Sequence, residues 1–547
     1  MSRMTGADAI VKTLRAYGVD TVFGLPGGQL DHLFDSMYKE GDALRVINSR
    51  HEQGAAYMAY GYAKSTGRIG AYTVVPGPGL LNSTAALCTA QANCAPVLCI
   101  SGQVESHGID SGQGHLHEID DQLGLIRHLT KWAERIDHPA QAPDLLREAF
   151  RQLLTGNPQP VEIEMAMDVM GSAAEVELQD AITEYAPPPI DLELIDRAAE
   201  LLAGAERPMI VIGSGALDAG ADLLAVAETL QAPVMSKRKG RGVIDDRHYL
   251  SQNLPAGHEL WAQADAVLAV GTRLKMPLTM WGVDQGLNIV HVDIDPNQIG
   301  RIHDPEIGIV GDARAVLRAL GKALADKNVS RVSREAELAQ LKARKMAEIR
   351  EHVGPQMAYL DVIRDVLPDD GIFVDEVTQV GFVSWYGFPV YRPRQFITAG
   401  HQGTLGYGYA TALGVVAGNP DKKVVQISGD GGFMFNVQEM ATAVQYGLDL
   451  VTVLFNDNRF GNVQRQQDEW FGGRRICSDL VNPDFVRLAD AFGATGLRAD
   501  SPEALRKALG DAFERDGPVL IEVSVTDMMP SPWRFLMMAQ TRERLCR

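Results

Sequence analysis

A glycine-rich turn that holds one aspartate offers the clearest chemistry in this sequence. Residues 429–432 read Gly-Asp-Gly-Gly and follow the β-branched run 424–427, which is typical of a buried parallel strand. The glycines let the backbone approach a ligand closely. A helix that begins near Phe433 would point free N–H groups at an anion such as phosphate, and the carboxylate of Asp430 suits a divalent cation beside it. The turn predicts a phosphate and metal site, although Gly-Asp-Gly alone is weak evidence.

A second polar turn, Asn456-Asp457-Asn458, follows the next predicted strand, 450–455. It lies one strand–helix–strand crossover after the first turn, since 457 − 430 = 27 residues. In parallel sheets the carboxyl ends of the strands meet at one edge, where ligands bind. Asp430 and Asp457 can therefore contribute oxygen ligands to one metal.

Glu52 is a candidate acid in another part of the chain. The motif Arg-His-Glu-Gln (50–53) follows the predicted strand 44–48 and opens a helix that continues Gly-Ala-Ala. One interpretation is an ordinary first-turn acid that the helix dipole stabilises. The other is a buried carboxylic acid whose pKa is raised by desolvation. The small apolar neighbours are compatible with that burial.

The elements that must position these residues alternate between strand and helix. Such alternation predicts an α/β protein whose parallel sheets carry helices on both faces. An acidic segment that ends in prolines and a charged helix interrupt the alternation. We predict an N-terminal domain (1–170), a linker (171–190), a central domain (191–329), a connecting helix (330–354), a third domain (355–527) and a C-terminal tail packed over a domain edge (528–547).

Size and charge narrow the class of protein. With 547 residues the chain has room for about three domains. The net charge of −19 argues against a nucleic-acid partner, no run approaches the ~18 apolar residues of a membrane span, and we expect no signal peptide. A cytoplasmic location fits the cysteines, which show no metal-binding spacing: Cys88, Cys94, Cys99, Cys477 and Cys546.

Six motifs occur in a fixed order along the chain. They are Val-Phe-Gly-Leu-Pro-Gly-Gly (22–28), Arg-His-Glu-Gln (50–53), Gly-Pro-Gly-Leu-Leu-Asn (77–82), Gly-Gln-Val (102–104), Gly-Thr-Leu-Gly-Tyr-Gly (403–408) and Gly-Asp-Gly-Gly (429–432). Together they resemble the acetolactate synthase (acetohydroxyacid synthase)-like family of thiamin-diphosphate-dependent enzymes over nearly the whole chain. The resemblance implies three doubly wound parallel-sheet domains: pyrimidine-binding, central and pyrophosphate-binding. It also implies a homodimer or homotetramer with active sites between chains.

The resemblance implies roles on both sides of the cofactor. Glu52 would activate the aminopyrimidine ring, which Pro26 and Asn82 would line. The Gly403 carbonyl would accept from the 4'-amino group, and Leu405 stands where a bulky apolar residue bends the cofactor. The diphosphate and Mg²⁺ would be held by Val377, Gln379, Gly429, Asp430, Gly431, Gly432, Asp457, Arg459, Gly461 and Asn462, with Asp430, Asp457 and the backbone carbonyl of Arg459 on the metal.

Asp457 departs from the asparagine that is usual in the family, and we prefer it as the ligand over a register shift to Asn456 or Asn458. Gln466 stands where the synthases carry a tryptophan that selects the second 2-oxoacid, which argues against a role in branched-chain amino-acid biosynthesis.

A third departure lies in the segment 109–118, which replaces a stretch that the synthases place near the thiazolium. It makes Gln113, His115 and His117 candidate catalytic residues, because imidazole suits proton transfer near neutral pH. The alternative, that both histidines belong to a surface loop, stays open, and His117 is the better candidate.

The central domain keeps Gly-Ser-Gly at 213–215, but 271–277 replaces the segment that contacts FAD in the family. Because one G-x-G is weak evidence for a nucleotide, we expect an empty or vestigial site and no FAD. The basic loop 237–242 could meet an anionic substrate tail or a nucleotide, but we interpret it as a solvated loop.

The resemblance implies a thiamin-diphosphate- and Mg²⁺-dependent 2-oxoacid decarboxylase or carboligase. A C2 carbanion would add to the carbonyl of a small 2-oxo substrate, and after loss of CO₂ the enamine would be protonated or captured by a second carbonyl. One alternative is a lyase or hydrolase that cleaves a diketone. Another is an inactive scaffolding or regulatory homologue, against which the intact Glu52 and Asp430 argue.

Overall fold

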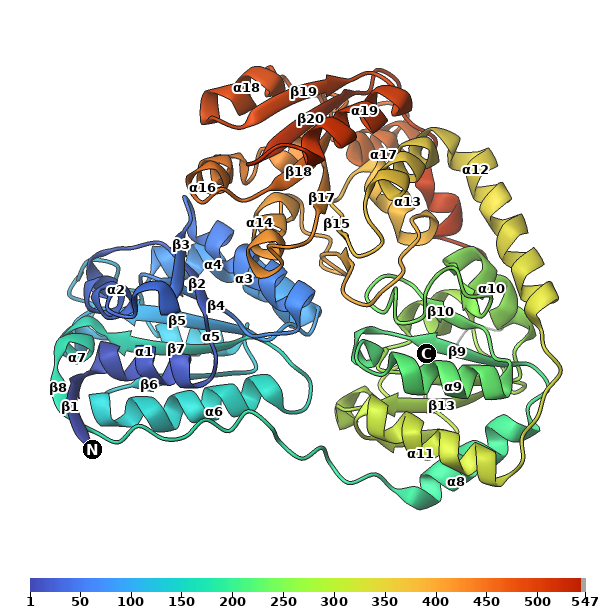
Figure 1. Cartoon of the computed structure of the whole chain (residues 1–547), viewed down its shortest axis with the longest axis horizontal. Coiled ribbons are helices and arrows are strands. Elements are labelled where there is room, and N and C mark those ends of the chain that lie inside the picture. Colours follow the sequence, from blue (N-terminus) through green and yellow to red (C-terminus); the bar gives the residue numbers. More distant parts are fainter. Residues whose placement is uncertain (543–547) are drawn as a thin grey trace.

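Three six-stranded sheets make up the chain in this computed structural model, which describes residues 1–542. In Figure 1 the N-terminal domain (blue to cyan) lies at the left, the central domain (green) at the lower right and the C-terminal domain (orange to red) at the top. All strand pairings within these three sheets are parallel. The predicted α/β fold with three parallel-sheet domains is confirmed.

The N-terminal sheet has the order β3-β2-β4-β5-β7-β6. Its strands are β2 (Thr21–Gly24), β3 (Arg45–Asn48), β4 (Gly70–Val74), β5 (Val97–Gln103), β6 (Trp132–Ile136) and β7 (Val161–Ala166). Its helices are α1 (Gly6–Ala16), α2 (Asp31–Tyr38), α3 (Glu52–Thr66), α4 (Pro78–Ala92), α5 (Gln122–Arg127), α6 (Ala142–Leu154) and α7 (Met167–Gly171). Strand β1 (Ser2–Thr5) pairs antiparallel with β8 (Ala173–Val176), so the segment predicted as a linker begins with a strand.

The C-terminal sheet has the order β16-β15-β17-β18-β20-β19. Its strands are β15 (Ile372–Val374), β16 (Phe396–Ile397), β17 (Val424–Gly429), β18 (Leu450–Asn456), β19 (Thr495–Ala499) and β20 (Val519–Ser524). Its helices are α13 (Gln379–Gly387), α14 (Gly408–Gly418), α15 (Asp430–Phe433), α16 (Met440–Gln445), α17 (Gly461–Phe471), α18 (Phe485–Phe492) and α19 (Pro502–Phe513). Counted from the first strand of each sheet along the chain, the N- and C-terminal sheets share one order: second, first, third, fourth, sixth, fifth.

The central sheet follows a different order, β11-β10-β9-β12-β13-β14, which is the order of dinucleotide-binding folds. Its strands are β9 (Pro208–Ile212), β10 (Val234–Ser236), β11 (Ser251–Gln252), β12 (Ala266–Val270), β13 (Asn288–Asp293) and β14 (Ile307–Val310). Its helices are α8 (Leu192–Gly204), α9 (Gly220–Leu230), α10 (Leu254–Gln263) and α11 (Ala313–Asp326). The middle strands β9 and β12 are buried along their whole length, as parallel strands covered on both faces require.

Helices α3 and α14 join the N- and C-terminal domains of the same chain. Gly61 of α3 lies against the backbone carbonyl of Thr411, and Gly414 of α14 lies against that of Met58. A Cβ atom at either glycine would collide with that backbone, so the two helices approach closely only because glycine stands at both crossings. This contact fixes how the two domains sit in one chain.

A long helix, α12 (Glu335–Val366), connects the central and C-terminal domains along the right edge of Figure 1. It continues well past residue 354, where we predicted the connecting helix to end. The backbone departs from helical geometry at Val353 (φ −127°, ψ 39°). Pro355, two residues later, lacks an N–H and disfavours a regular preceding turn, which accounts for the kink.

The C-terminal tail packs against two domains. Met529 and Phe535 are buried, and the backbone N–H groups of Thr541 and Arg542 donate to the carbonyl of Trp281 in the central domain. The part of the predicted tail from 543 to 547, including Cys546, lies outside the described residues. Among residues 1–542, no helix is both long and apolar enough to cross a membrane.

Candidate active site

A cavity of about 170 Å³ lies at the carboxyl ends of β17 and β18, in the C-terminal domain. Its walls include Val377, Gln379, Leu405, Gly429, Asp430, Gly431, Gly432, Asp457, Arg459, Gly461 and Asn462. The structure therefore gathers in one cavity eleven residues that the sequence proposed for cofactor binding. Gly403 is not in this lining. The cavity is also lined by Phe382, Val525 and Met529, which no sequence motif predicted to belong to the site.

Two glycines of this cavity have close neighbours where a side chain would stand. A Cβ atom on Gly431 would lie 2.5 Å from Cε1 of Phe460, and one on Gly461 would lie 2.8 Å from Oδ2 of Asp457. We predicted a helix that begins near Phe433, but the helical turn α15 begins at Asp430 and contains only four residues. The cradle for a diphosphate consequently combines the glycine backbone of 429–432 with the first residues of two longer helices, Gln379 of α13 and Gly461 of α17.

Two carboxylates, those of Asp430 and Asp457, line this cavity together with the positively charged Arg459. The pKa of Asp457 is raised to about 7, first by burial and then by the nearby charge of Asp430, although the positive charge of Arg459 lowers it in part. Burial also raises the pKa of Asp430. A divalent cation between the two carboxylates would remove this repulsion, and oxygen atoms are the ligands that Mg²⁺ prefers. The donor set present here therefore fits a metal that bridges to a diphosphate.

The second polar turn shows which side chain can act as the ligand. Asp457 lines the cavity, whereas neither Asn456 nor Asn458 does. Both asparagines accept instead from Nδ2 of Asn482, at 3.1 and 3.2 Å, and this amide also donates to Oδ2 of Asp430 at 2.6 Å. The position of these side chains favours Asp457 as the ligand. Asn482 is a polar neighbour of the site that no sequence motif predicted.

Glu376 is a second buried acid that the sequence did not reveal. Its carboxylate accepts the backbone N–H groups of Val377 (3.0 Å), Gly406 (3.3 Å) and Gly408 (2.7 Å). Burial raises its pKa to about 8. These bonds tie the turn at Val377, which faces the proposed diphosphate position, to the loop that carries Gly403 and Leu405.

The N-terminal domain holds a separate group of predicted residues. Glu52 is the first residue of α3, its side chain is 12% exposed, and its Oε2 accepts from Nδ2 of Asn82 at 3.0 Å. A Cβ atom on Gly79, in the first turn of α4, would lie 3.5 Å from the other oxygen of Glu52. Pro26 follows the end of β2 and is exposed. Glu52 thus lies half-buried at the carboxyl edge of the sheet, with Asn82 as its hydrogen-bond partner. We call the position formed by Glu52, Gly79 and Asn82 the Glu52 notch.

The two candidate histidines face different surroundings. The Nδ1 atom of His117 lies 3.2 Å from Oε1 of Gln29, which follows the Pro26-Gly27-Gly28 turn. The ring of His115 is turned inward and packs edge-to-face on His107, with ring centroids 5.5 Å apart. Its Nε2 is buried and has no hydrogen-bond partner among residues 1–542. Gln113 is exposed on the loop. Of these three, His117 is the one whose ring contacts Gln29, in the short helix Gly28–Leu30 that follows β2 and Pro26.

The loop that carries these histidines is held by an acid. The carboxylate of Glu118 accepts the N–H groups of Gly112 (2.7 Å), Gly114 (2.8 Å) and His115 (2.9 Å). These bonds lower the pKa of Glu118, the bond from His115 most of all. The loop is consequently built around an ionised carboxylate rather than left to solvent.

The basic loop 237–242 is not solvated, so our interpretation was wrong. Arg238 donates to the Gly400 carbonyl at 2.6 Å and its guanidinium lies 4.1 Å above the ring of Trp385. Lys239 donates to the Ala92 carbonyl at 3.0 Å, and burial lowers its pKa to about 8. The loop instead ties the central domain to both other domains, which sequence could not show because its partners lie far along the chain.

Comparison with known proteins identifies the family. Models for thiamine pyrophosphate (TPP) enzymes match in three parts: the N-terminal TPP binding domain at residues 4–125, the central domain at 195–320 and the C-terminal TPP binding domain at 376–523. The chain belongs to the thiamin diphosphate (thiamine pyrophosphate) enzyme family. The predicted cofactor is therefore supported, and the two groups of residues described above fall in the two TPP binding domains.

Relatives place this thiamin diphosphate enzyme more closely. It is 32% identical over 548 residues to a probable acetolactate synthase large subunit of Methanocaldococcus jannaschii, covering 95% of this chain and 92% of the relative. It is 33% identical over 535 residues to a probable 2-ketoarginine decarboxylase AruI of Pseudomonas aeruginosa (95% and 94%). It is 30% identical over 539 residues to the acetolactate synthase isozyme 3 large subunit of Escherichia coli (94% and 93%). The chain is an enzyme of the acetolactate synthase family, of the decarboxylase or carboligase type.

Proposed function

We propose that this thiamin diphosphate enzyme decarboxylates a small 2-oxoacid and releases the product as an aldehyde, with Mg²⁺ as its metal. The observation that carries the proposal is the placement of His117 by Gln29 at the sheet edge that also holds Glu52 and Asn82. When bound, thiamin diphosphate supplies a carbon nucleophile for the 2-oxo group and accepts the electron pair left behind by CO₂. The protein must then supply protons.

The bonds of Gln29 define how His117 can handle a proton. Nε2 of Gln29 donates to the Leu116 carbonyl at 3.0 Å, which leaves its Oε1 to accept from Nδ1–H of His117. The other ring nitrogen, Nε2 of His117, is then the one free to exchange a proton. When His117 is an imidazolium, both ring nitrogens carry a proton, and it can give the Nε2 proton to the reacting carbon and then take another from solvent. Such protonation favours release of an aldehyde over capture by a second carbonyl.

Gln466 favours the same outcome from the opposite domain. It lies half-buried on α17, one of the helices that border the cavity. A polar amide does not form the aromatic wall that tryptophan provides in the synthases for a second 2-oxoacid. The relative named as a 2-ketoarginine decarboxylase supports decarboxylation within this group.

Mg²⁺ would be held by Asp430, Asp457 and the backbone carbonyl of Arg459. The shared cavity of the two aspartates and the raised pKa of Asp457 support this assignment. The glycines at 431, 432 and 461, with Val377, Gln379 and Asn462, would surround the diphosphate. Trp533 of the tail fixes Asn462 through a 2.9 Å bond from Nε1 to Oδ1.

The complete site would form between two copies of the chain. Within residues 1–542, no side chain of the N-terminal domain lines the cavity that holds Asp430. Large apolar side chains are exposed beside both half-sites: Leu81 and Leu116 in one domain, Met434 and Phe435 in the other. A second chain that covers these side chains would bring its Glu52 to this chain's Asp430.

A substrate panel tests the proposal. Enzyme reconstituted with thiamin diphosphate and Mg²⁺ is incubated with pyruvate, 2-ketoarginine, longer 2-oxoacids and diketones, and products are read by mass spectrometry. We expect CO₂ and an aldehyde from at least one 2-oxoacid, and we expect His117→Ala to slow turnover while cofactor affinity stays unchanged. Acyloin as the main product, or diketone cleavage without CO₂, would contradict aldehyde release. If His117→Ala turned over substrate as fast as wild type, His117 would be a surface-loop residue without a role in proton transfer.

A further inference from the structure

Gln122 is a fully buried amide that joins separate parts of the N-terminal domain. Its Oε1 accepts the backbone N–H of Gly77 at 2.8 Å. Its Nε2 lies 2.8 Å from Oε2 of Glu164, 3.2 Å from the Gly102 carbonyl and 3.4 Å from Oγ of Ser101. Both ends of the side chain are therefore used, one toward a turn and the other toward the strands β5 and β7.

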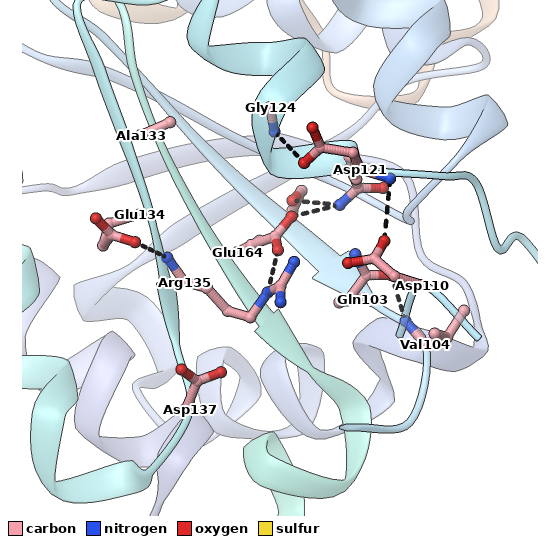
Figure 2. A network of polar contacts seen from close by, with 12 residues as sticks. Gln103, Val104, Asp110, Asp121, Gly124, Ala133, Glu134, Arg135, Asp137 and Glu164 are labelled. Atoms are coloured by element: carbon pink, nitrogen blue, oxygen red, sulfur yellow. Dashed lines mark hydrogen bonds and ion pairs between the residues drawn. The ribbon is translucent and has the colours of Figure 1, made fainter. Parts of the chain in front are cut away.

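The orientation of this amide is set by the charge behind it. Glu164 is fully buried and its other oxygen accepts from Nε of Arg135 on the neighbouring strand β6, as Figure 2 shows. An ionised carboxylate can only accept hydrogen bonds, so it must face the NH₂ group of Gln122. The carbonyl oxygen of Gln122 is thereby turned toward Gly77. A second bond at this end of α5, from the Asp121 N–H to Asp110 at 3.0 Å, secures the loop that precedes Gln122 (Figure 2).

The turn that Gln122 holds forms one wall of the Glu52 notch. Gly77 is the N-cap of α4 and has no side-chain cap of its own, and within residues 1–542 no other acceptor is in hydrogen-bond range of its N–H. The first turns of α4 carry Gly79, which packs beside Glu52, and Asn82, which donates to it. Gly77 has φ +57°, and the His117 carbonyl occupies the space that a Cβ atom would need. The turn therefore lies against the Glu52 side chain and against the backbone of His117.

We propose that Gln122 is a positioning residue for this enzyme: held by Glu164, its amide fixes the 76–79 turn and so sets Asn82 and Glu52 in register with the cofactor. The inference rests on the proposed role of Glu52. Gln122 itself touches neither Glu52 nor the cavity, so it acts through the backbone of Gly77. Loss of its amide would leave a buried N–H without an acceptor and let the first turn of α4 shift.

The first test uses protein without cofactor. Gln122→Met keeps the length of the side chain and removes both bonds. We expect faster amide hydrogen exchange in the peptide that spans residues 77–82. Gln395→Met is the matched control, because Gln395 is also buried and also bonds at both ends, to Asp369 and Arg392, but in the C-terminal domain. Equal exchange of the 77–82 peptide in the two variants would overturn the proposal.

The second test measures C2–H exchange of bound thiamin diphosphate, which reports on Glu52 without substrate turnover. We expect Gln122→Met to slow C2–H exchange by about tenfold, the order expected for one lost buried hydrogen bond, while its affinity for the cofactor stays unchanged. The exchange rate of the control variant, Gln395→Met, should stay near that of wild type. In Gln122→Glu, a protonated carboxyl can still donate to Glu164 and accept from Gly77. The exchange rate relative to wild type should therefore fall as pH rises and the two carboxyl groups repel each other. If the exchange rate of Gln122→Glu relative to wild type did not change with pH, this would contradict the proposal that Glu164 holds the side chain at position 122.

Glu52→Gln separates this inference from the proposal beneath it. Normal C2–H exchange in Glu52→Gln would overturn the role of Glu52, and with it the reason for positioning. Abolished exchange in Glu52→Gln together with wild-type exchange in Gln122→Met would overturn the role of Gln122 alone.

Discussion

Two inactive variants of this enzyme should restore activity when they share an oligomer. Glu52 belongs to a notch of the N-terminal domain, and Asp430 belongs to a cavity whose described lining residues all lie between 377 and 529. We therefore pair Glu52 of one chain with Asp430 of another. Glu52→Gln disables the first half of the site and Asp430→Ala the second.

The size of the recovery follows from this geometry. When the variants mix at a ratio of 1:1, half of all sites receive a native Glu52, and half of those receive a native Asp430 from the facing chain. About a quarter of the wild-type activity should return, in dimers and in pairs of dimers alike. If both residues acted within one chain, every site would carry one substitution and nothing would return.

The assay is co-expression of the two variants with different affinity tags, followed by activity per chain. Capture by either tag shows that the chains share oligomers, and mass spectrometry gives their ratio. Glu52→Gln mixed with wild type is the control and should retain about half of the activity, since each site needs one native Glu52. Shared oligomers at 1:1 without activity above that of either variant alone would refute a site between chains.

Three further outcomes are expected. Glu52→Gln should nearly abolish C2–H exchange of bound thiamin diphosphate while the protein still binds the cofactor, as measured by NMR and calorimetry; a normal exchange rate would remove Glu52 from its role. Asp430→Ala, or removal of Mg²⁺ by a chelator, should abolish cofactor binding in calorimetry, because the repelling pair at Asp430 and Asp457 needs a cation; unchanged affinity would refute the metal assignment. Burial raises the pKa of Glu162 well above its usual value. The contribution of the protonated side chain to the free energy of unfolding is therefore complete at low pH and is lost as pH rises through the folded-state pKa. Glu162→Gln should therefore lose less free energy of unfolding than wild type as pH rises above 4.5, the ordinary pKa of glutamate, in urea titrations. Equal losses would contradict a protonated Glu162.

Much of the fold could be predicted from local sequence. Runs such as 424–427 and 450–455 became β17 and β18, because β-branched residues between glycine turns suit buried parallel strands. The limits of elements were less certain: α12 runs on to Val366 despite Pro355, since packing of its last turns on the C-terminal domain outweighs the proline. Similarly, α15 begins at Asp430, three residues before the position that we expected.

From spacing alone, the candidate site could be predicted only where its residues lie in one strand–turn unit, and the family resemblance supplied the more distant residues Val377, Gln379 and Leu405. Asp430 and Asp457 follow adjacent strands of one sheet, so their spacing already brought them together. Glu376, Asn482 and Gln122 gave no such signal. Their side-chain partners are 21 to 52 residues away and their other partners are backbone groups, and no periodicity of the sequence encodes these contacts.

By itself, then, the sequence determined the type of fold, because glycine turns and strand periodicity are local properties of the chain, and its six motifs indicated thiamin diphosphate through their resemblance to a known family. Only the tertiary structure decided that His117 and not His115 contacts Gln29, that the loop 237–242 is turned inward, and that Glu52 and Asp430 occupy separate halves. The physical reason is that burial and hydrogen-bond partners depend on how distant segments pack, and a buried polar group must find its partner wherever the fold places one.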